Sequence, residues 1–454
     1  MAKKTLIENA SILNEGQNRR GSVLIEGESI VHLFEEKEPI PESLKKQVEE
    51  RIDAEGLYLI PGMIDAHVHF REPGLTQKGD IRTESRAAVA GGVTSYMDMP
   101  NVRPLTTSRA AVEEKLSIAA ANSLANYAFY LGITDENIEE ALHIDPSIVC
   151  GLKLFLGSST GNMLVRDSRL ISRLMKSRLP IAVHAEDEAI IESNRKKIEA
   201  SYAGRPIPIC IHPVIRSTEA CVRATKFIIE EAKRSGAHLH ILHISTSEEL
   251  ELLKDRSGAE RHITAETCPQ YLWFDDRKYE TLGARMKCNP AIKTSEDRKA
   301  LLRGLSDGTI DTIGTDHAPH LLSDKEGDCL HAASGTPQIQ YVIPLLFELV
   351  KQGHLQAERI PTLTAHHPAD IYGISKRGYI REGYQADLVL VDPNQDTTVT
   401  SEGILSKCGW SPYEGETFTS SIVRTLVNGV TVYDRGKIIE TVSSPSQPLK
   451  FIRG

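Results

Sequence analysis

Two histidines with the spacing of a metal site lie early in the chain, at His67 and His69 in the segment IDAHVHF. Alternate side chains of a β-strand point to the same side, so in a strand both imidazoles face a single point. Neutral imidazoles are common ligands of zinc and similar ions. A pair of surface or core histidines is the alternative, but the apolar segment that precedes them favours a strand that ends in ligands. We therefore predict a metal site at this pair.

Asp316 is a second residue with metal chemistry, because it ends an apolar segment in TIGTDHAPH. A carboxylate can bind a metal ion and can also take a proton from water, whose pKa falls toward about 7 on such an ion. An aspartate that only caps a turn is the alternative, and the nearby His317 and His320 weigh against it. Together with His67 and His69, this residue predicts a metal-dependent hydrolase in which Asp316 moves protons.

Two more histidines end apolar segments, His184 in PIAVHAED and His243 in LHILHIST. Each alone is more often structural, but two at equivalent strand ends favour further metal ligands. His238 and His240 belong to the same segment as His243. The two-residue period of a strand puts His240 on the face opposite His243, so we predict that His238 and His240 are structural.

Lys153 lies among apolar neighbours in GLKLFLG, where a bare ammonium is costly to bury. A lysine there can extend to solvent or pair with a carboxylate. The functional alternative is that carbon dioxide adds to the neutral amine and gives a carbamate, which can bridge two metal ions. That reaction needs an amine with a lowered pKa, as burial beside a metal provides. The residue pattern alone leaves both alternatives open.

The elements that must position these residues are short apolar strands alternating with amphipathic helices between residues 61 and 377. One predicted helix begins after Ser217, a plausible N-cap, and ends at Gly236. This alternation predicts an α/β fold with a catalytic (β/α)8 barrel, similar to a TIM barrel. The active site of such a barrel gathers at the C-terminal ends of its strands, where the chain carries His67, His69, Lys153, His184, His243 and Asp316.

Both ends of the chain, residues 1–60 and 378–454, have the alternating apolar pattern of half-buried antiparallel strands. Asn428 and Gly429 favour a hairpin turn, since both can take positive φ. We predict that the two termini together form one small, discontinuous β-sandwich domain.

Composition narrows the class of partner. The chain has 454 residues, a net charge of −9 and a pI near 6.0, which argues against nucleic acid and acidic membranes. No stretch approaches the roughly 20 apolar residues that span a bilayer, and the first residues do not read as a secretory signal. The seven cysteines are scattered, with no CxxC pair, and predict free thiols in a reducing cytoplasm.

Three dense polar motifs carry a family resemblance: HVHFREPG at 67–74, MPN at 99–101 and GTDHAPHLLSDK at 314–325. With these, nearly the whole chain resembles the amidohydrolase superfamily, and within it the dihydroorotases. The resemblance implies two divalent metal ions, most often Zn²⁺. His67, His69 and Asp316 hold one ion, His184 and His243 the other, and carbamylated Lys153 bridges them.

The same resemblance implies an activity. A hydroxide shared by the ions opens the ring of L-dihydroorotate, and the reverse reaction closes N-carbamoyl-L-aspartate in pyrimidine (UMP) biosynthesis. Asp316 acts as general acid and base. Arg71, Asn101 and His320 match positions that hold the substrate carboxylate, and Asn289 resembles a further ring contact. An arginine suits this task because its guanidinium grips a carboxylate with two hydrogen bonds. The alternative without a function in binding is a surface ion pair between Arg71 and Glu72.

Two rival functions stay open from the sequence. The segment AETCPQYLWF at 265–274 resembles hydantoinases or allantoinases more than most dihydroorotases, and SGTPQIQYVIPLL at 334–346 differs from the usual substrate loop of dihydroorotases. A hydantoinase, dihydropyrimidinase or allantoinase, whose ring lacks the carboxylate, is therefore one rival. A non-catalytic relative that serves as an assembly subunit is the other, although all six ligand positions are present. The expected partner is a small-molecule substrate, and assembly into a homo-oligomer stays open.

Overall fold

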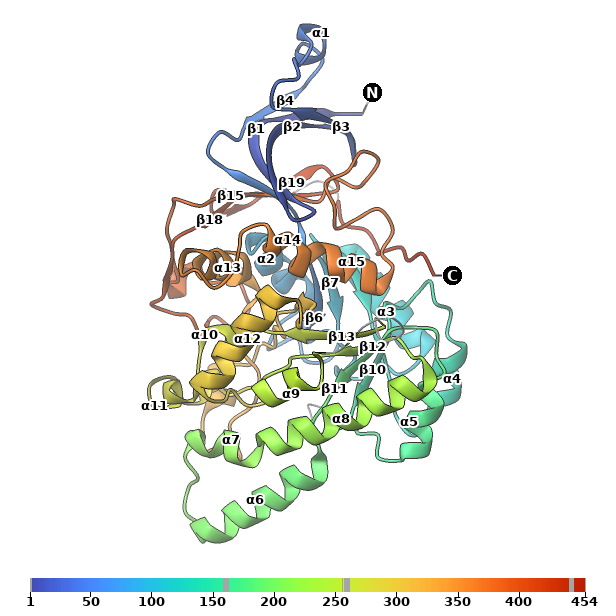
Figure 1. Ribbon diagram of the computed structural model, residues 1–454, viewed down its shortest axis with the longest axis vertical. Helices are drawn as coiled ribbons and strands as arrows, with labels where there is room; N and C mark the ends of the chain where they lie inside the picture. Colours follow the sequence, from blue (N-terminus) through green and yellow to red (C-terminus); the bar gives the residue numbers. More distant parts are fainter. Residues whose placement is uncertain (1, 158–162, 255, 257–261, 441–444, 454) are drawn as a thin grey trace.

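The computed structural model describes residues 2–157, 163–254, 256, 262–440 and 445–453. A barrel of parallel strands and outer helices carries a β-rich domain on one side, built from both ends of the chain (Figure 1). The predicted α/β class is confirmed.

The barrel strands pair in parallel and in chain order. They are β6 (Met63–Val68), β7 (Val93–Asp98), β8 (Asn126–Phe129), β9 (Leu131–Gly132), β10 (Leu152–Phe155), β11 (Ile181–His184), β12 (Leu239–Ile241), β13 (Ile263–Thr267) and β14 (Thr312–Ile313). The short strands β8 and β9 follow each other directly and join the two runs. The ring closes where the His69 amide donates to the His317 carbonyl at 2.8 Å.

Helices alternate with these strands and cover the barrel. They are α2 (Ile81–Ala90), α3 (Arg109–Asn122), α4 (Ile138–His143), α5 (Ser168–Leu174), α6 (Glu188–Tyr202), α7 (His212–Ile215), α8 (Thr218–Ser235), α9 (Ser247–Glu251), α10 (Pro269–Trp273), α11 (Tyr279–Leu282), α12 (Ser295–Asp307), α13 (Val342–Lys351), α14 (Arg359–Pro361) and α15 (His367–Tyr372).

The bounds of α8 confirm the predicted start and stop signals. The Ser217 hydroxyl accepts a hydrogen bond from the Ala220 amide, as an N-cap does, and Gly236 takes a left-handed φ of 74° at the other end.

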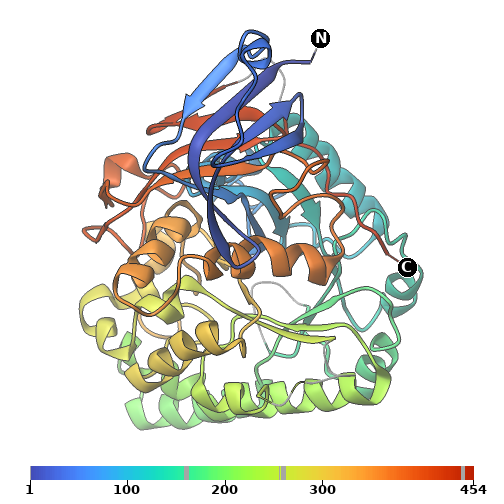
Figure 2. The ribbon, with the colours of Figure 1, turned by 45° about the horizontal axis from the view of Figure 1, so that its top comes forward.

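The terminal domain is a nine-stranded sheet in the order β20-β19-β18-β15-β5-β1-β2-β3, with β4 beside β1. Figure 2 shows its N-terminal and C-terminal strands side by side. Its strands are β1 (Lys4–Asn14), β2 (Gln17–Glu26), β3 (Ser29–Glu35), β4 (Glu50–Asp53), β5 (Tyr58–Pro61), β15 (Leu388–Asp392), β18 (Ser421–Val427), β19 (Val430–Asp434) and β20 (Lys437–Ile438), with α1 (Glu42–Lys45) between β3 and β4 and the pair β16 (Thr397–Thr398) and β17 (Thr417–Phe418) apart.

The sheet is mixed rather than purely antiparallel, which corrects the prediction. Strand β1 pairs in parallel with both β4 and β5. A parallel pair needs a crossover connection, and the segment that contains α1 provides it. The predicted hairpin at Asn428 and Gly429 is confirmed, because these residues have φ of 49° and 75° and join the antiparallel strands β18 and β19.

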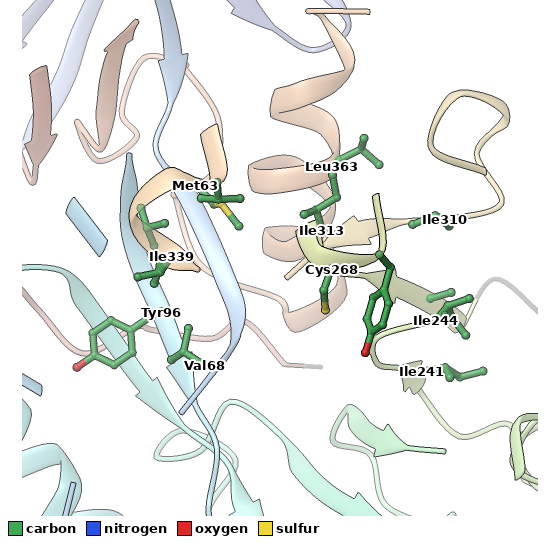
Figure 3. Packing of buried hydrophobic residues seen from close by; sticks show 14 of the residues in the cluster. Met63, Val68, Tyr96, Ile241, Ile244, Cys268, Ile310, Ile313, Ile339 and Leu363 are labelled. Carbon is green, nitrogen blue, oxygen red and sulfur yellow. The ribbon is translucent and has the colours of Figure 1, made fainter. Parts of the chain in front are cut away.

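One large apolar core unites the two parts of the molecule. It contains barrel residues such as Met63, Val68 and Ile313, and also Val389 and Ile422 of the terminal sheet. Figure 3 shows residues of this core, among them Met63, Val68 and Ile313 from barrel strands. The other face of the sheet has its own cluster around Ile7, Val23 and Leu390. The sheet is therefore buried on both faces along its middle, which fixes it against the barrel.

Two smaller expectations concern the whole chain. All seven cysteines are free thiols, as predicted. Within the described residues, no helix combines the length and apolar character needed to cross a membrane.

Candidate metal centre

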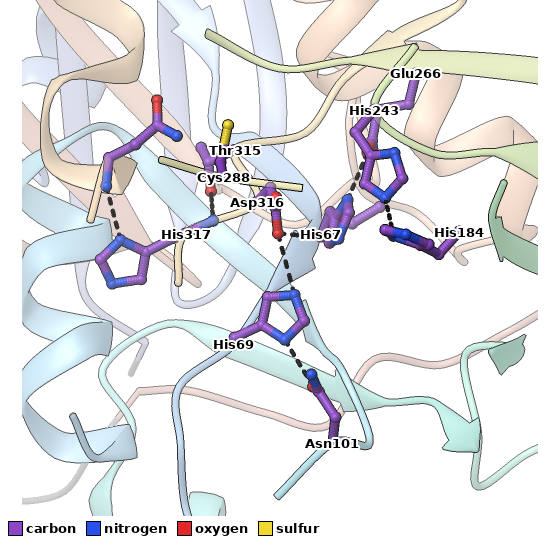
Figure 4. A network of polar contacts seen from close by, with 12 residues as sticks. His67, His69, Asn101, His184, His243, Glu266, Cys288, Thr315, Asp316 and His317 are labelled. Carbon is purple, nitrogen blue, oxygen red and sulfur yellow. Dashed lines mark hydrogen bonds and ion pairs between the residues drawn. The ribbon is translucent and has the colours of Figure 1, made fainter. Parts of the chain in front are cut away.

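The first group of predicted ligands converges at the barrel mouth. His67 and His69 come from β6 and the residue after its end, and Asp316 follows β14. The Asp316 Oδ1 atom lies 3.3 Å from Nε2 of His67 and 3.1 Å from Nε2 of His69 (Figure 4). All three residues are buried, and their ligand atoms lie within 4.8 Å of one another.

The second group lies next to the first. Nδ1 of His184 and Nε2 of His243 face each other at 2.8 Å, and the His243 ring centroid is 5.4 Å from that of His67. One cavity unites both groups with three of the four predicted substrate residues; its lining includes His67, His69, Arg71, Asn101, Lys153, His184, His243, Asn289 and Asp316.

Lys153 lies inside β10 and is 1% exposed, so it does not extend to solvent. Its Nζ sits 4.6 Å from the ring centroid of Phe155, and no described residue accepts a hydrogen bond from it. Burial lowers the pKa of Lys153 to about 7, against which Asp316 and Glu266 act more weakly. A buried amine of this kind has a large neutral fraction near neutral pH.

Three of the four candidate histidine ligands make a further polar contact that orients the ring. Nδ1 of His67 is 2.7 Å from Glu266 Oε1, and Nδ1 of His69 is 2.7 Å from Asn101 Oδ1. Nε2 of His184 is 2.8 Å from Glu186 Oε2, a carboxylate that also pairs with Arg216. Such contacts fix which ring nitrogen is free for a metal.

Sequence reasoning missed Glu266 and Glu186. The signal was available, because Glu266 lies in the predicted strand RHITAE and Glu186 follows His184 by two residues. Both carboxylates are fully buried, and Oε2 of Glu266 and Oε1 of Glu186 have no hydrogen-bond partner among the described residues. A buried carboxylate without full pairing points to a cation nearby.

The protonation of the site suits a metal. Burial lowers the pKa of His69 to about 4 and that of His243 well below its usual range, so both rings are neutral at neutral pH. Burial opposes ionisation of Asp316, but His67 and His69 hold the pKa of its carboxyl below the ordinary value. Neutral imidazoles and an ionised carboxylate are the forms that bind divalent ions. The donor set therefore fits a divalent metal centre.

The backbone is strained at three site residues, which have left-handed φ: Arg71 at 69°, His243 at 43° and Asp316 at 48°. Non-glycine residues adopt this region at a cost, and such strain concentrates at functional sites.

The turn at His243 corrects the prediction that His240 and His243 point to opposite faces of a strand. Because β12 ends at Ile241 and the chain turns at His243, both His240 and His243 point into the barrel; Nε2 of His240 is 3.6 Å from Glu266.

Arg71 is 2% exposed, and its Nε donates to the Pro319 carbonyl at 3.0 Å. The carboxylate of Glu72 instead accepts from the Ile81 amide at 2.9 Å, so the Arg71–Glu72 ion pair is not formed. Strand β6 ends at Val68, so Arg71 lies in the loop beyond it.

The remaining substrate candidates gather at the same mouth. One Arg71 guanidinium nitrogen lies 3.1 Å from Nε2 of His320. Asn101 uses its Oδ1 on His69, which leaves its Nδ2 to donate elsewhere. Oδ1 of Asn289 lies 3.1 Å from Nε2 of His212, a buried histidine that the sequence did not single out.

With this fold and site, the chain belongs to the amidohydrolase family, whose sequence profile matches residues 58–432. Similar proteins in this family carry the name dihydroorotase. That of Halobacterium salinarum is 36% identical over 389 residues, 84% of this chain and 88% of that protein. That of Pediococcus pentosaceus is 30% identical over 442 residues, 95% of this chain and 99% of that protein.

Solved structures confirm the barrel fold. The L-hydantoinase (dihydropyrimidinase) from Arthrobacter aurescens is 25% identical, with a TM-score of 0.91, and covers 99% of this chain and 100% of its own. The dihydropyrimidinase from Brevibacillus agri NCHU1002, 24% identical with a TM-score of 0.87 over 99% of this chain and 100% of its own, shows the fold alone. The predicted enzyme class, a metal-dependent cyclic amidohydrolase, is confirmed.

Proposed function

We propose that this enzyme is a dihydroorotase, which interconverts L-dihydroorotate and N-carbamoyl-L-aspartate in pyrimidine biosynthesis. The observation that carries the proposal is the buried Arg71, which lines the cavity of the metal ligands beside Asn101. No carboxylate within the described part of the chain forms an ion pair with this guanidinium. A buried guanidinium needs an anion, and the ring of dihydroorotate carries one. The names of the relatives agree with this choice.

The cofactor in this proposal is a pair of Zn²⁺ ions. His67, His69 and Asp316 would hold one, His184 and His243 would hold the other, and Lys153, as a carbamate, would be the ligand common to both. Two ions of this kind polarise a carbonyl and lower the pKa of water, which is the chemistry that amide hydrolysis needs. The buried position of Lys153 near both groups, with no hydrogen-bond acceptor among the described residues, supports the carbamate.

The protein's own groups then orient the ring and move protons. Arg71, Asn101 and His320 hold the carboxylate, and Asn289 contacts the ring. Asp316 takes the proton of the attacking water and returns it to the ring nitrogen as the amide bond breaks. His67 and His69 lie against Asp316 and hold the pKa of its carboxyl below the ordinary value, so the carboxylate stays ionised and ready to accept that proton.

The proposal also covers the division of the chain into two domains and the compartment in which the enzyme works. Residues 61–377 form the catalytic domain and residues 1–60 with 378–454 the terminal domain; the sheet strands fall within 4–61 and 388–438. The enzyme works in the cytoplasm, which its seven free cysteines support.

A hydantoinase-type activity is the rival, favoured by the similarity to the Arthrobacter aurescens structure. An uncharged ring leaves the Arg71 guanidinium without an anion in a buried site, which disfavours binding. A non-catalytic assembly role is disfavoured because all six proposed ligands line one cavity.

The test is metal reconstitution followed by a panel of rings. The purified protein is stripped with a chelator, reloaded with Zn²⁺, and assayed with L-dihydroorotate, hydantoin, dihydrouracil and allantoin. We expect activity to return with about two ions per chain and to be highest on L-dihydroorotate. Highest activity on an uncharged ring supports the hydantoinase alternative, and no activity with less than one ion per chain supports the assembly role.

A further inference from the structure

His320 lies between two cations, and its ring cannot accept a hydrogen bond from both. Nε2 is 3.1 Å from an Arg71 guanidinium nitrogen, and Nδ1 is 3.0 Å from Nζ of Lys78. The ring is buried, and burial together with Arg71, Lys78 and Lys325 lowers the pKa of His320 far below its usual value. The imidazole is therefore neutral.

A neutral imidazole has one N–H and one acceptor nitrogen, whereas neither a guanidinium nor an ammonium can accept. Only one of the two contacts is therefore a hydrogen bond at any time. Asp324 does not offer Nδ1 another partner, because its carboxylate is 3.6 Å from that atom, too far for a hydrogen bond. Lys78 is thus the group close enough to satisfy Nδ1.

The Lys78 ammonium is held where it can donate a hydrogen bond to Nδ1 of His320. Its Nζ pairs with the Asp324 carboxylate at 3.1 Å, and Asp324 in turn accepts from the Leu321 amide. Arg71 donates through Nε to the Pro319 carbonyl, has another guanidinium nitrogen beside His320, and lines the cavity. Lys78 is therefore tied to Asp324 next to the ring, whereas Arg71 lies at the cavity.

We propose that Lys78 is a positioning residue that keeps Nδ1 of His320 as the acceptor, so that the Nε2–H donates to a substrate carboxylate together with Arg71. This inference rests on the proposed function, because it assigns that carboxylate to the ring of dihydroorotate. With the proton on Nε2, two donors converge on one point, which is an arrangement that one carboxylate oxygen satisfies. With the proton on Nδ1, His320 offers the carboxylate only a lone pair.

The test compares Zn²⁺-loaded wild type with Lys78→Met, the conservative Lys78→Arg and a matched control, Lys299→Met. Lys299 is an exposed lysine that pairs with Glu296 on α12 and does not line the cavity. Three quantities are measured: KM for L-dihydroorotate, kcat for L-dihydroorotate, and the inhibition constant of uncharged dihydrouracil. The tautomer of His320 is read by ¹⁵N NMR of histidine-labelled enzyme, with the signal assigned by its loss in His320→Asn.

We expect Lys78→Met to raise KM for L-dihydroorotate by about tenfold or more, with kcat changed less than about threefold. Dihydrouracil binding should stay unchanged, Lys78→Arg should restore most of the affinity, and the control should match wild type. The His320 signal should indicate Nε2–H in wild type and lose that form in Lys78→Met.

Either of two results overturns the inference: an unchanged KM with an unchanged tautomer, or an equal loss of affinity for the charged and uncharged rings. Failure of the proposed function looks different, since wild type then does not act on L-dihydroorotate. The tautomer of His320 in wild type and Lys78→Met still decides the role of Lys78 in that case.

Discussion

At the scale of single residues, the proposed chemistry depends on Asp316, whose carboxylate contacts both His67 and His69 from a strained backbone position. The residue types and their places at strand ends were readable in the sequence. The groups behind them were not, because a buried carboxylate such as Glu266 is recognised by its contact with His67 across 199 positions of sequence. No local pattern contains such a contact.

Asp316→Asn should lower kcat by about 10²–10⁴-fold, because the amide cannot accept the proton. The amide oxygen can still coordinate, so at least half of the metal should remain. Steady-state kinetics and metal analysis of the same preparation check both points. A kcat within tenfold of wild type contradicts the proton role of Asp316, and complete metal loss shows that its main role is as a ligand.

At the scale of elements, α2 braces the strand end that carries Asp316. Glu84 of α2 is fully buried; its Oε2 is 2.7 Å from Nε2 of His317 and accepts from the Ser406 hydroxyl at 2.6 Å. Its Oε1 accepts from the Lys407 amide at 3.0 Å. One carboxylate thus ties a barrel helix, a barrel strand end and a segment of the terminal domain together.

Glu84→Ala should reduce the free energy of unfolding by about 3 kcal/mol, because it leaves the buried His317 ring and Ser406 hydroxyl, and the Lys407 amide, without this partner. Glu114→Ala, at an exposed position of α3, is the matched control and should change it by less than about 0.5 kcal/mol. Urea denaturation of the two variants and wild type measures the difference. Equal stability of the two variants contradicts the bracing role.

Element types and helix caps could be predicted because they depend on neighbouring residues, as the Ser217 cap and the Asn428–Gly429 turn show. The turns that follow the strands could not. Strand alternation failed for His240 because the left-handed φ at His243 reverses the direction of its side chain. Tertiary packing imposes that conformation.

At the scale of the whole molecule, strand partners are set by contacts across long stretches of chain. The apolar pattern of both termini predicted a shared β domain, but it could not show that β15 pairs with β5 and that β1 lies parallel to β4. Alternation fixes which face of a strand is buried, and not which strand lies beside it. The barrel order was predictable because each strand pairs with its neighbour in the chain.

Metal-free protein should lose stability as the pH falls from about 6.5 to about 4. Burial holds the pKa of His69 at about 4 in the folded chain, below its ordinary value of 6.5, so the unfolded chain takes up a proton first. Over that window His69 alone removes about 3 kcal/mol of stability. Urea denaturation at pH 7.5 and 4.5 checks this, and His69→Asn should show a smaller fall. An equal fall in the variant contradicts the assignment.

The central claim is that a metal-dependent amidohydrolase site selects a carboxylated ring through Arg71. The most direct measurement is the ratio of kcat/KM for L-dihydroorotate to that for dihydrouracil, in Zn²⁺-loaded wild type and Arg71→Met. We predict a ratio well above ten in wild type, and a fall of about tenfold or more in the variant through a higher KM for L-dihydroorotate. A wild-type preference for dihydrouracil, or a ratio that Arg71→Met leaves unchanged, would contradict it.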